Sequence, residues 1–196
     1  GSTVLRARAF LPGWGPSRTL THTYVFPSDI FNQPAQPAGL PNSWGGAGSD
    51  GLSIAADYEM DPTVITDPAY SGRLQTALTN HPIVSLVMNQ DEWLDPSVGI
   101  YISPNSDPAT PRESFTSVEY MEPNGPGMFQ IDAGVRVSGN GSPRRWSSKK
   151  LSLRLLSMGA CGSGMLEYPP LGEGATTSFA TRTTAGYAAF PGHFAF

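Results

Sequence analysis

The stretch from Gly134 to Leu156 combines residue types that suit the binding of an anion. It reads G-V-R-V-S-G-N-G-S-P-R-R-W-S-S-K-K-L-S-L-R-L-L, so one alternating run leads into a turn of glycines and a serine, and a basic segment leads into a second alternating run. The basic residues are Arg144, Arg145, Lys149 and Lys150. This layout predicts a hairpin whose loop could approach a phosphate or another anion, because backbone N–H groups and nearby cations bind phosphate oxygens.

Acidic residues supply a second kind of candidate chemistry. Asp57, Glu59 and Asp61 recur at every second position, but proline stands where an EF-hand loop starting at Asp57 needs its Gly and its Glu, so that motif fails. A looser calcium site built from Asp57, Asp61 and Asp67, or from Asp50, stays open. Solvated loop carboxylates are the favoured interpretation.

Two further features could serve sugar chemistry. Asp91, Glu92 and Asp95 place carboxylates close together in sequence, and glycoside hydrolysis requires two carboxyl groups at a defined separation. Acidic turn residues are the more common case. Trp146, inside the basic segment, could stack on a sugar ring if it is exposed, as could Trp14, Trp44 and Trp93, and core packing is the competing interpretation.

Other reactive residue types give weaker signals. His22, His81 and His193 lie far apart and show no metal-ligand spacing, so no zinc site is predicted. Cys161 is the only cysteine, which excludes a disulfide within this chain. A catalytic thiol needs an accompanying base, and the sequence offers only scattered histidines, so a structural role is favoured for Cys161.

Composition narrows the class of protein. The 196 residues include 22 glycines and 19 prolines, about a fifth of the chain, which favours short strands joined by many turns. The formal net charge of −4 argues against a general nucleic-acid binder. No run of about eighteen apolar residues predicts a membrane span, and no signal-peptide pattern opens the chain.

The elements that must position these residues are mainly strands. Alternating runs with Gly/Pro-rich turns predict a mainly-β fold, an antiparallel sandwich or barrel-like sheet with one short helix and long loops. Thr3–Phe10 and Leu20–Phe26 predict a hairpin, which needs a partner surface because a lone hairpin is only marginally stable. Further strands are expected at Ile83–Met88, Gly99–Ser103, Ser114–Met121, Phe129–Val137 and around Leu151, Leu153 and Leu155.

The single expected helix follows Asp67, which suits the N-cap position, with Pro68 as the first helical residue and Asn80 at the end. Residues 1–27 are interpreted as a terminal hairpin of a larger domain, and residues 28–56 as a linker or irregular loop. Residues 57–175 are interpreted as the main β domain and residues 176–196 as an irregular tail.

The first hairpin carries a recognisable pattern. Its residues are Thr3-Val-Leu-Arg-Ala-Arg-Ala-Phe, then Pro16-Ser, then Thr23-Tyr-Val-Phe. They resemble the last two strands of the small immunoglobulin-like domain appended to bacterial chitobiases and β-hexosaminidases. The resemblance implies a truncated immunoglobulin-like domain.

A longer resemblance spans residues 57–175. Its blocks are Asp61-Pro-Thr-Val, Asp67-Pro-Ala-Tyr-Ser-Gly, His81-Pro-Ile-Val-Ser-Leu-Val, Asp95-Pro-Ser-Val-Gly-Ile-Tyr, Ser117-Val-Glu-Tyr, Phe129-Gln-Ile-Asp-Ala-Gly-Val-Arg-Val-Ser-Gly, Lys149-Lys-Leu-Ser-Leu-Arg-Leu-Leu and Leu166-Glu-Tyr-Pro. Together they resemble the N-terminal part of bacterial CotH-type proteins, in the large secreted or surface form that carries chitobiase-like and lamin-tail-like modules nearby. In that family the segment corresponds to the N-lobe of an atypical secretory kinase.

The CotH resemblance implies roles for particular residues. It implies that Gly139, Asn140, Gly141 and Ser142 form the turn that covers a nucleotide, and that Lys149 or Lys150 approaches the phosphates of Mg-ATP. Phosphoryl transfer also needs a base and metal-binding residues, which the family supplies from its C-lobe.

The sequence departs from the family pattern in two places. The usual Trp-Glu-Arg-Pro is replaced by Pro111-Arg112-Glu113-Ser114, and the match decays after Pro170. We therefore expect a truncated CotH-type chain that binds an anion or nucleotide without being a competent kinase by itself. In the parent protein it is expected to be secreted or on the cell surface.

Two other functions stay open from the residues. The acidic loops between Asp50 and Asp107 motivate a calcium-assisted extracellular hydrolase acting on glycans or lactones. The chitobiase-like start and the tryptophans motivate a carbohydrate-binding or adhesive module with a cell-surface glycan as partner. Neither nucleic acid nor a membrane span is expected.

Overall fold

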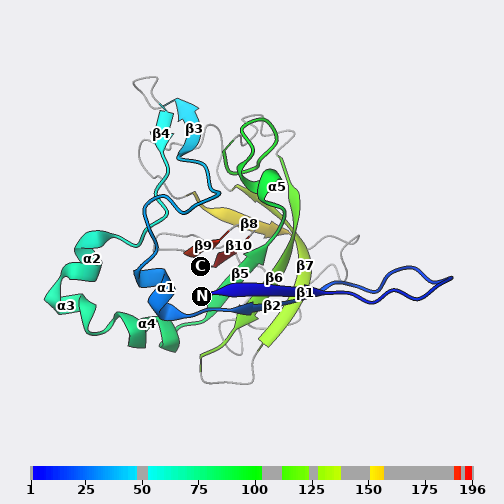
Figure 1. Ribbon diagram of the computed structural model, residues 1–196, viewed down its shortest axis with the longest axis horizontal. Coiled ribbons are helices and arrows are strands. Elements are labelled where there is room, and N and C mark those ends of the chain that lie inside the picture. The colour runs from blue at the N-terminus through cyan, green and yellow to red at the C-terminus, as the bar shows by residue number, and fades with distance from the viewer. Residues whose placement is uncertain are drawn as a thin grey trace.

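The computed structural model describes residues 2–47, 53–102, 112–123, 128–137, 151–156, 188–190 and 193–195. These residues form mainly strands, and every strand pair among them is antiparallel, which confirms the predicted mainly-β fold (Figure 1). The strands are β1 Thr3–Ala7, β2 Leu20–Tyr24, β3 Ser43–Ala47, β4 Ser53–Ala55, β5 Ile83–Val87, β6 Ser114–Met121, β7 Met128–Val137, β8 Leu153–Leu156, β9 Ala188–Phe190 and β10 His193–Ala195. The helices are α1 Pro27–Phe31, α2 Pro62–Thr66, α3 Pro68–Ser71, α4 Leu74–Asn80 and α5 Gln90–Leu94.

The largest described sheet has the strand order β8-β7-β6-β5-β10-β9. Its longest pairing joins β6 and β7 without a register break, from Ser114 opposite Val135 to Met121 opposite Met128. Strands β5, β6 and β7 lie within one residue of their predicted bounds. Local alternation therefore located this part of the sheet correctly, because β-branched and aromatic residues suit a pleated surface.

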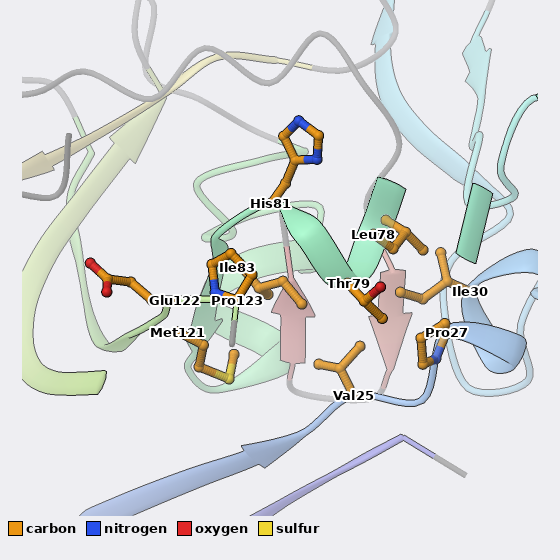
Figure 2. A pocket seen from close by; sticks show the side chains of 10 residues that line it. All are labelled: Val25, Pro27, Ile30, Leu78, Thr79, His81, Ile83, Met121, Glu122 and Pro123. Carbon is orange, nitrogen blue, oxygen red and sulfur yellow. The ribbon is translucent and has the colours of Figure 1, made fainter. Parts of the chain in front are cut away.

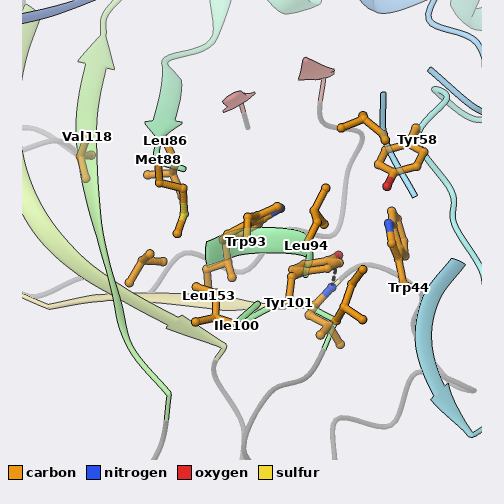
Figure 3. Close-up of a cluster of buried hydrophobic side chains, with 14 of the residues drawn as sticks. Trp44, Tyr58, Leu86, Met88, Trp93, Leu94, Ile100, Tyr101, Val118 and Leu153 are labelled. Atoms are coloured by element: carbon orange, nitrogen blue, oxygen red, sulfur yellow. Dashed lines mark hydrogen bonds between the residues drawn. The ribbon is translucent and has the colours of Figure 1, made fainter. Parts of the chain in front are cut away.

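One face of this sheet supports the hydrophobic core. Leu86 on β5, Val118 on β6 and Val135 on β7 point to this face and are buried. Four aromatic side chains cover them from the connecting segments: Trp44, Tyr58, Trp93 and Tyr101 (Figure 3). Trp93 stacks on Tyr101 with ring centroids 5.1 Å apart, and Trp44 meets Tyr58 and Tyr101 edge-on at 5.3 Å.

The opposite face of the same sheet is covered by the β1–β2 hairpin, whose strands pair from Thr3 opposite Tyr24 to Ala7 opposite Leu20. Strand β2 buries Thr21 and Thr23 and exposes Leu20, His22 and Tyr24. The predicted hairpin is confirmed, and the sheet is the partner surface that it needs. The buried side of β2 is its threonine side, because the sheet surface beneath it is polar.

Three local expectations require correction. Gly99–Ser103 was expected as a strand, but residues 100–102 form a turn, and the backbone N–H groups of Ile100 and Tyr101 donate to the carbonyls of Glu92 and Trp93 in α5. These groups are therefore not available to a sheet. A Cβ at Gly99 would lie 2.5 Å from the Asp95 nitrogen, so the close approach of this turn to α5 requires glycine.

The helical content also differs from the expectation of one helix. The expected helix does begin after Asp67 and end at Asn80, but it is divided into α3 and α4, and α1, α2 and α5 are additional. Residues 28–56, expected as a linker or irregular loop, contribute most of α1, all of β3 and β4, and the core residues Leu40 and Trp44. Among the described helices none is long and apolar enough to cross a membrane.

Candidate functional site

The segment that carries the predicted anion-binding residues connects two neighbouring strands. Strands β7 and β8 pair antiparallel, with Gly134 opposite Leu156 and Val137 opposite Leu153. Residues 138–150 lie between them and are outside the described residues, so Gly139, Asn140, Gly141, Ser142, Lys149, Lys150 and Trp146 have no described positions. The pairing of the flanking strands confirms the strand–connection–strand layout predicted for this stretch.

The return of the chain to β8 is anchored in the core. Leu151, the residue after Lys150, is buried, and its backbone N–H donates to the Tyr101 hydroxyl at 3.1 Å. Tyr101 belongs to the aromatic cluster, so the position directly after both lysines is tied to the hydrophobic core. The other end of the connection is fixed by β7, which pairs with β6 along its length.

Two arginines flank the connection on paired positions. Arg136 on β7 lies opposite Arg154 on β8. Like charges directly opposite each other destabilise a strand pair. Arg136 donates to Glu113 at 2.9 Å, which offsets its charge, whereas Arg154 is exposed. The base of the hairpin thus adds cationic side chains to those predicted in its loop.

The acidic residues proposed for calcium serve as helix caps where the structure describes their bonds. Asp61 accepts hydrogen bonds from the N–H and the hydroxyl of Thr63 at 2.8 and 2.7 Å at the start of α2. Asp67 accepts from the Ala69 N–H at 2.8 Å at the start of α3, which confirms its predicted capping role. Asp57 is half-buried nearby in sequence. Among the described residues no three His, Cys, Asp or Glu side chains are grouped to hold a metal ion, so calcium binding stays a prediction.

The carboxylates considered for glycoside chemistry also have structural uses. Glu92, in the first turn of α5, accepts a hydrogen bond from the Ser114 hydroxyl on β6. Asp95 follows α5 and accepts from the N–H groups of Ser97 and Val98 at 2.7 and 3.0 Å. Asp91 is exposed in the same turn as Glu92. These contacts agree with the interpretation of the three residues as acidic residues of turns.

The tryptophans divide into buried and exposed positions. Trp44 and Trp93 are fully buried in the aromatic cluster, so they do not form a sugar-stacking platform, and that suggestion is wrong for both. Trp14, at the tip of the β1–β2 hairpin, is 77% exposed. The structure therefore leaves Trp14 as an accessible indole among the described residues.

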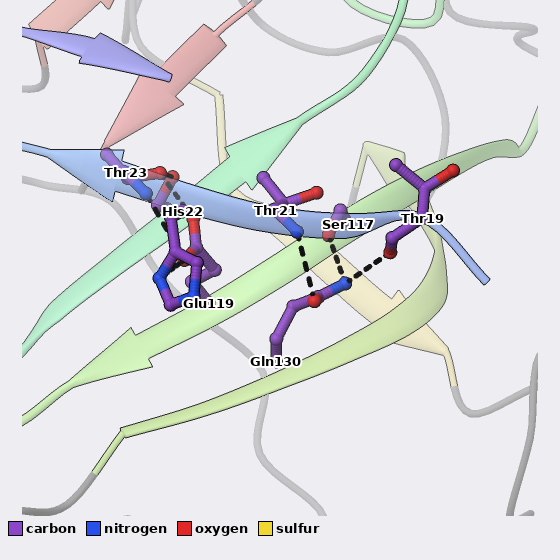
Figure 4. A network of polar contacts seen from close by, with 8 residues as sticks. Thr19, Thr21, His22, Thr23, Ser117, Glu119 and Gln130 are labelled. Carbon is purple, nitrogen blue, oxygen red and sulfur yellow. Dashed lines mark hydrogen bonds and ion pairs between the residues drawn. The ribbon is translucent and has the colours of Figure 1, made fainter. Parts of the chain in front are cut away.

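A buried polar network was not predicted from the sequence. Glu119 on β6 is only 2% exposed and lies under β2, where it accepts hydrogen bonds from the Thr23 N–H at 3.2 Å and from the Thr23 hydroxyl (Figure 4). The Thr23 hydroxyl also lies 2.7 Å from that of Ser85. His22 Nδ1 is 3.9 Å from the carboxylate and stays largely exposed.

A second group of contacts continues this network along the hairpin. The Gln130 side chain on β7 accepts from the Thr21 N–H at 3.1 Å and donates to the Ser117 hydroxyl at 2.9 Å and the Thr19 carbonyl at 3.3 Å (Figure 4). The sheet side chains thus satisfy the outward N–H groups of β2. The only sequence signal was the alternation of Ser117 and Glu119 with apolar neighbours on β6.

A cavity of about 210 Å³ lies between the ends of β5 and β6 and helices α1 and α4. Its lining is mostly apolar and includes Val25, Ile30, Leu78, Ile83 and Met121 (Figure 2). His81 lies at this cavity, and its Nδ1 is 2.7 Å from the Ala77 carbonyl at the end of α4. This bond uses one imidazole nitrogen of His81 to close the helix.

No protein-family model, curated protein or solved structure compared with this chain matches it.

Proposed function

We propose that this chain is a β-rich part of a secreted or surface CotH-type protein in which the β7–β8 hairpin binds a nucleoside triphosphate or a related anion. The proposal concerns binding and not phosphoryl transfer. The resemblance places the catalytic base and the metal ligands of the family in a second lobe, and none of the matching blocks belongs to that lobe.

The observation that carries the proposal is the anchoring of both ends of the basic connection. Strand β7, which pairs with β6 and β8, leads into the connection, and the backbone N–H of Leu151 at its other end donates to the Tyr101 hydroxyl. A loop that binds phosphate gains affinity when its ends are already ordered, because less conformational entropy is lost on binding. In the sequence, Lys150 directly precedes this anchored residue.

The charges at the base of the hairpin support the same proposal. Arg136 and Arg154 occupy opposite positions, one residue away from the last pair before the connection, which is Val137 opposite Leu153. Because Arg136 is paired with Glu113, the exposed Arg154 is the cation that a bound polyanion would meet at the base of the hairpin, and guanidinium groups suit phosphate oxygens because of their planar set of donors.

The chain offers a sharp test, because Lys149 and Lys150 are its only two lysines. An acyl phosphate derivative of ATP transfers its acyl group to a lysine amine that lies beside the bound phosphates. We expect labelling at Lys149 or Lys150, identified by peptide mass spectrometry, and loss of labelling when excess Mg-ATP competes. Labelling that excess Mg-ATP does not reduce would contradict the proposal.

Thermal shift provides an independent measurement. A ligand at about 100 times its Kd stabilises the folded state by about 2.7 kcal/mol, which raises Tm by several degrees. We expect this rise with Mg-ATP in the parent chain and its loss in Lys149→Ala/Lys150→Ala. The matched control is Arg6→Ala/Arg73→Ala, which removes two exposed cations that lie outside the β7–β8 hairpin. This variant should keep the rise in Tm with Mg-ATP. No rise in the parent would rule out nucleotide binding.

The two other functions gain no specific support from the described residues. The hydrolase hypothesis relied on acidic loops whose Asp61 and Asp67 are helix caps. The carbohydrate-binding hypothesis relied on four tryptophans, two of which are buried. Neither is therefore advanced as a second candidate.

A further inference from the structure

Exposed apolar side chains gather on the β1–β2 hairpin. Of the large apolar residues that are exposed in the described part of the chain, most lie before residue 27: Leu5, Phe10, Leu11, Trp14, Leu20, Tyr24 and Phe26. Leu5, Leu20 and Tyr24 share the side of the hairpin that faces away from the sheet, because Thr21 and Thr23 take the side that faces it. Contiguous exposed apolar surface of this kind marks an interaction site.

The tip of this hairpin holds its apolar residues in a fixed arrangement. The Trp14 N–H donates to the Leu11 carbonyl at 3.0 Å, and Gly13 between them has φ +83°. With Pro12 at the second position, these are the features of a type II turn, whose third position requires a positive φ. A second hydrogen bond joins the two chain segments that flank the turn, because the Ser17 N–H donates to the Ala9 carbonyl at 3.0 Å.

The tip also projects from the molecule. In Figure 1 the connection between β1 and β2 extends well beyond the edge of the sheet. The hairpin cannot fold back easily, because Gln130 and Glu119 hold β2 on the sheet through the N–H groups of Thr21 and Thr23. Phe10, Leu11 and Trp14 are therefore exposed on a convex apex that projects beyond the described sheet, where they can reach a flat surface.

The charge of the hairpin is opposite to that of the chain. Residues 1–28 contain three arginines and no Asp or Glu, whereas the whole chain has a formal net charge of −4. Arg8 and Arg18 flank the tip. The Arg8 guanidinium lies 4.5 Å from the centre of the Phe10 ring, and Arg18 makes one exposed contact with Asp132 at 3.4 Å. Both can extend beside an apolar apex toward anionic groups.

We propose that the hairpin tip docks on an anionic lipid bilayer surface. Trp14 and Phe10 enter the interfacial region, where amphipathic and aromatic rings are favoured. Arg8 and Arg18 meet the anionic headgroups, an attraction that falls with ionic strength. The order of the residues matches the order of the layers in a bilayer. The apolar residues at the end of the apex reach the apolar interior, and the arginines behind them lie level with the charged headgroups. This arrangement fits less well into an acidic protein groove or on a uniformly polar polysaccharide.

The test uses the full chain and vesicles of phosphatidylcholine with or without phosphatidylserine. We expect sedimentation with the anionic vesicles, weaker binding as salt is raised, and little binding to phosphatidylcholine alone. Trp14→Ala should weaken the partition by about tenfold, since an exposed aromatic side chain then buries far less apolar area. Arg8→Gln/Arg18→Gln should remove most of the preference for phosphatidylserine.

Control variants separate docking from loss of folding. Tyr70→Ala removes an exposed aromatic ring on α3, away from the hairpin, and should bind like the parent. Circular dichroism should show unchanged folding in Trp14→Ala, because the Trp14 side chain is exposed. Brominated lipids should quench the Trp14 fluorescence in the parent, and Trp14→Phe should retain binding while losing that quenching.

Several results would overturn the proposal. These are no binding to anionic vesicles, or binding that Trp14→Ala leaves unchanged. Retention on an acidic polysaccharide without vesicle binding would assign the tip to glycans instead. Concentration-dependent self-association that Trp14→Ala abolishes, again without vesicle binding, would assign it to a second copy of the chain.

Discussion

The two faces of the β5–β6–β7 sheet are buried by different kinds of contact. On one face, Leu86, Val118 and Val135 pack beneath the rings of the aromatic cluster. On the other, Ser85, Glu119 and Gln130 hold the edge of β2 through hydrogen bonds. Both faces exclude water, but only the first gains free energy in proportion to its buried apolar area.

The two faces therefore differ in whether they mainly stabilise the fold or set the orientation of the β1–β2 hairpin. Apolar packing is non-directional, so the aromatic face stabilises the fold without setting the orientation of the segments that pack on it. Hydrogen bonds depend on angle and distance, and a buried donor left without a partner is costly. The polar face therefore contributes less net stability but sets where the hairpin lies and which way its tip points.

The largest expected effect comes from the aromatic face. Trp93→Ala should lower the free energy of unfolding by about 3–5 kcal/mol, because it leaves a cavity next to Tyr101. Urea unfolding followed by circular dichroism measures it. Trp14→Ala is the matched control and should change stability by less than about 0.5 kcal/mol, since Trp14 is exposed. Equal losses for the two variants would show that the cluster is not the core.

The next effect comes from the polar face. Glu119→Ala should cost about 2–3 kcal/mol, because the Thr23 N–H and hydroxyl lose their buried acceptor. The loss of stability should be concentrated in β2. Hydrogen exchange at the Thr21 and Thr23 amides should therefore accelerate more than exchange in β6 and β7. Glu119→Gln keeps an acceptor oxygen and should cost less. A uniform increase of exchange over the whole sheet would contradict an anchoring role.

A smaller effect follows from the aromatic face at high pH. Burial raises the pKa of the Tyr58 hydroxyl above its usual 10.0, and this hydroxyl donates to the Pro41 carbonyl at 3.0 Å. The folded state therefore keeps the proton to higher pH than the unfolded state. The stability linked to this proton is complete below pH 10 and is lost as the pH rises through the raised pKa.

Comparison of the parent with Tyr58→Phe measures that contribution. Tyr58→Phe should cost about 1 kcal/mol at pH 7 through the lost hydrogen bond, and its stability should fall less steeply than that of the parent above pH 10. Because burial also raises the pKa of the Tyr120 hydroxyl, tyrosinate absorbance should show one late-ionising residue fewer in the variant than in the parent. Identical pH profiles would mean that Tyr58 ionises normally.

The smallest effect on the free energy of unfolding is expected at the solvent-exposed end of the polar face. Arg18→Ala removes the 3.4 Å contact with Asp132, in which the arginine side chain is largely exposed and the carboxylate is partly exposed. Such pairs contribute about 0–1 kcal/mol, so the change should be under about 0.5 kcal/mol in urea unfolding. A loss as large as that of Glu119→Ala would show that the anchoring of the hairpin extends to its tip.

Local signals in the sequence predicted elements whose causes are themselves local. Asp67 followed by Pro68 marked a helix start because the cap bond and the fixed φ involve only neighbouring residues. The alternation in Ser114–Met121 and Phe129–Val137 located β6 and β7. The glycine and basic pattern of 134–156 predicted a connection between paired strands, and β7 and β8 do pair.

Long-range contacts explain where prediction failed. Ile100 and Tyr101 alternate like a strand, but their N–H groups bond to carbonyls of α5, which no local pattern reveals. Trp44 lies in a stretch rich in glycine and proline, and it is buried in a cluster with Tyr58 and Tyr101, which are distant in sequence. The alternation of β6 does not show that Glu119 is buried, because the strand that covers it, β2, lies about a hundred residues earlier in the chain.

The sequence by itself determined the mainly-β class, the bounds of the central strands, the first hairpin and the helix start capped by Asp67, because each depends on residues close together in the chain. Only the tertiary structure decided which side of β2 is buried, which tryptophans are accessible, and that Leu151 is tied to Tyr101 directly after the two lysines. Burial and hydrogen-bond pairing of polar groups depend on partners that are distant in sequence, so they appear only when the sheet brings those partners together.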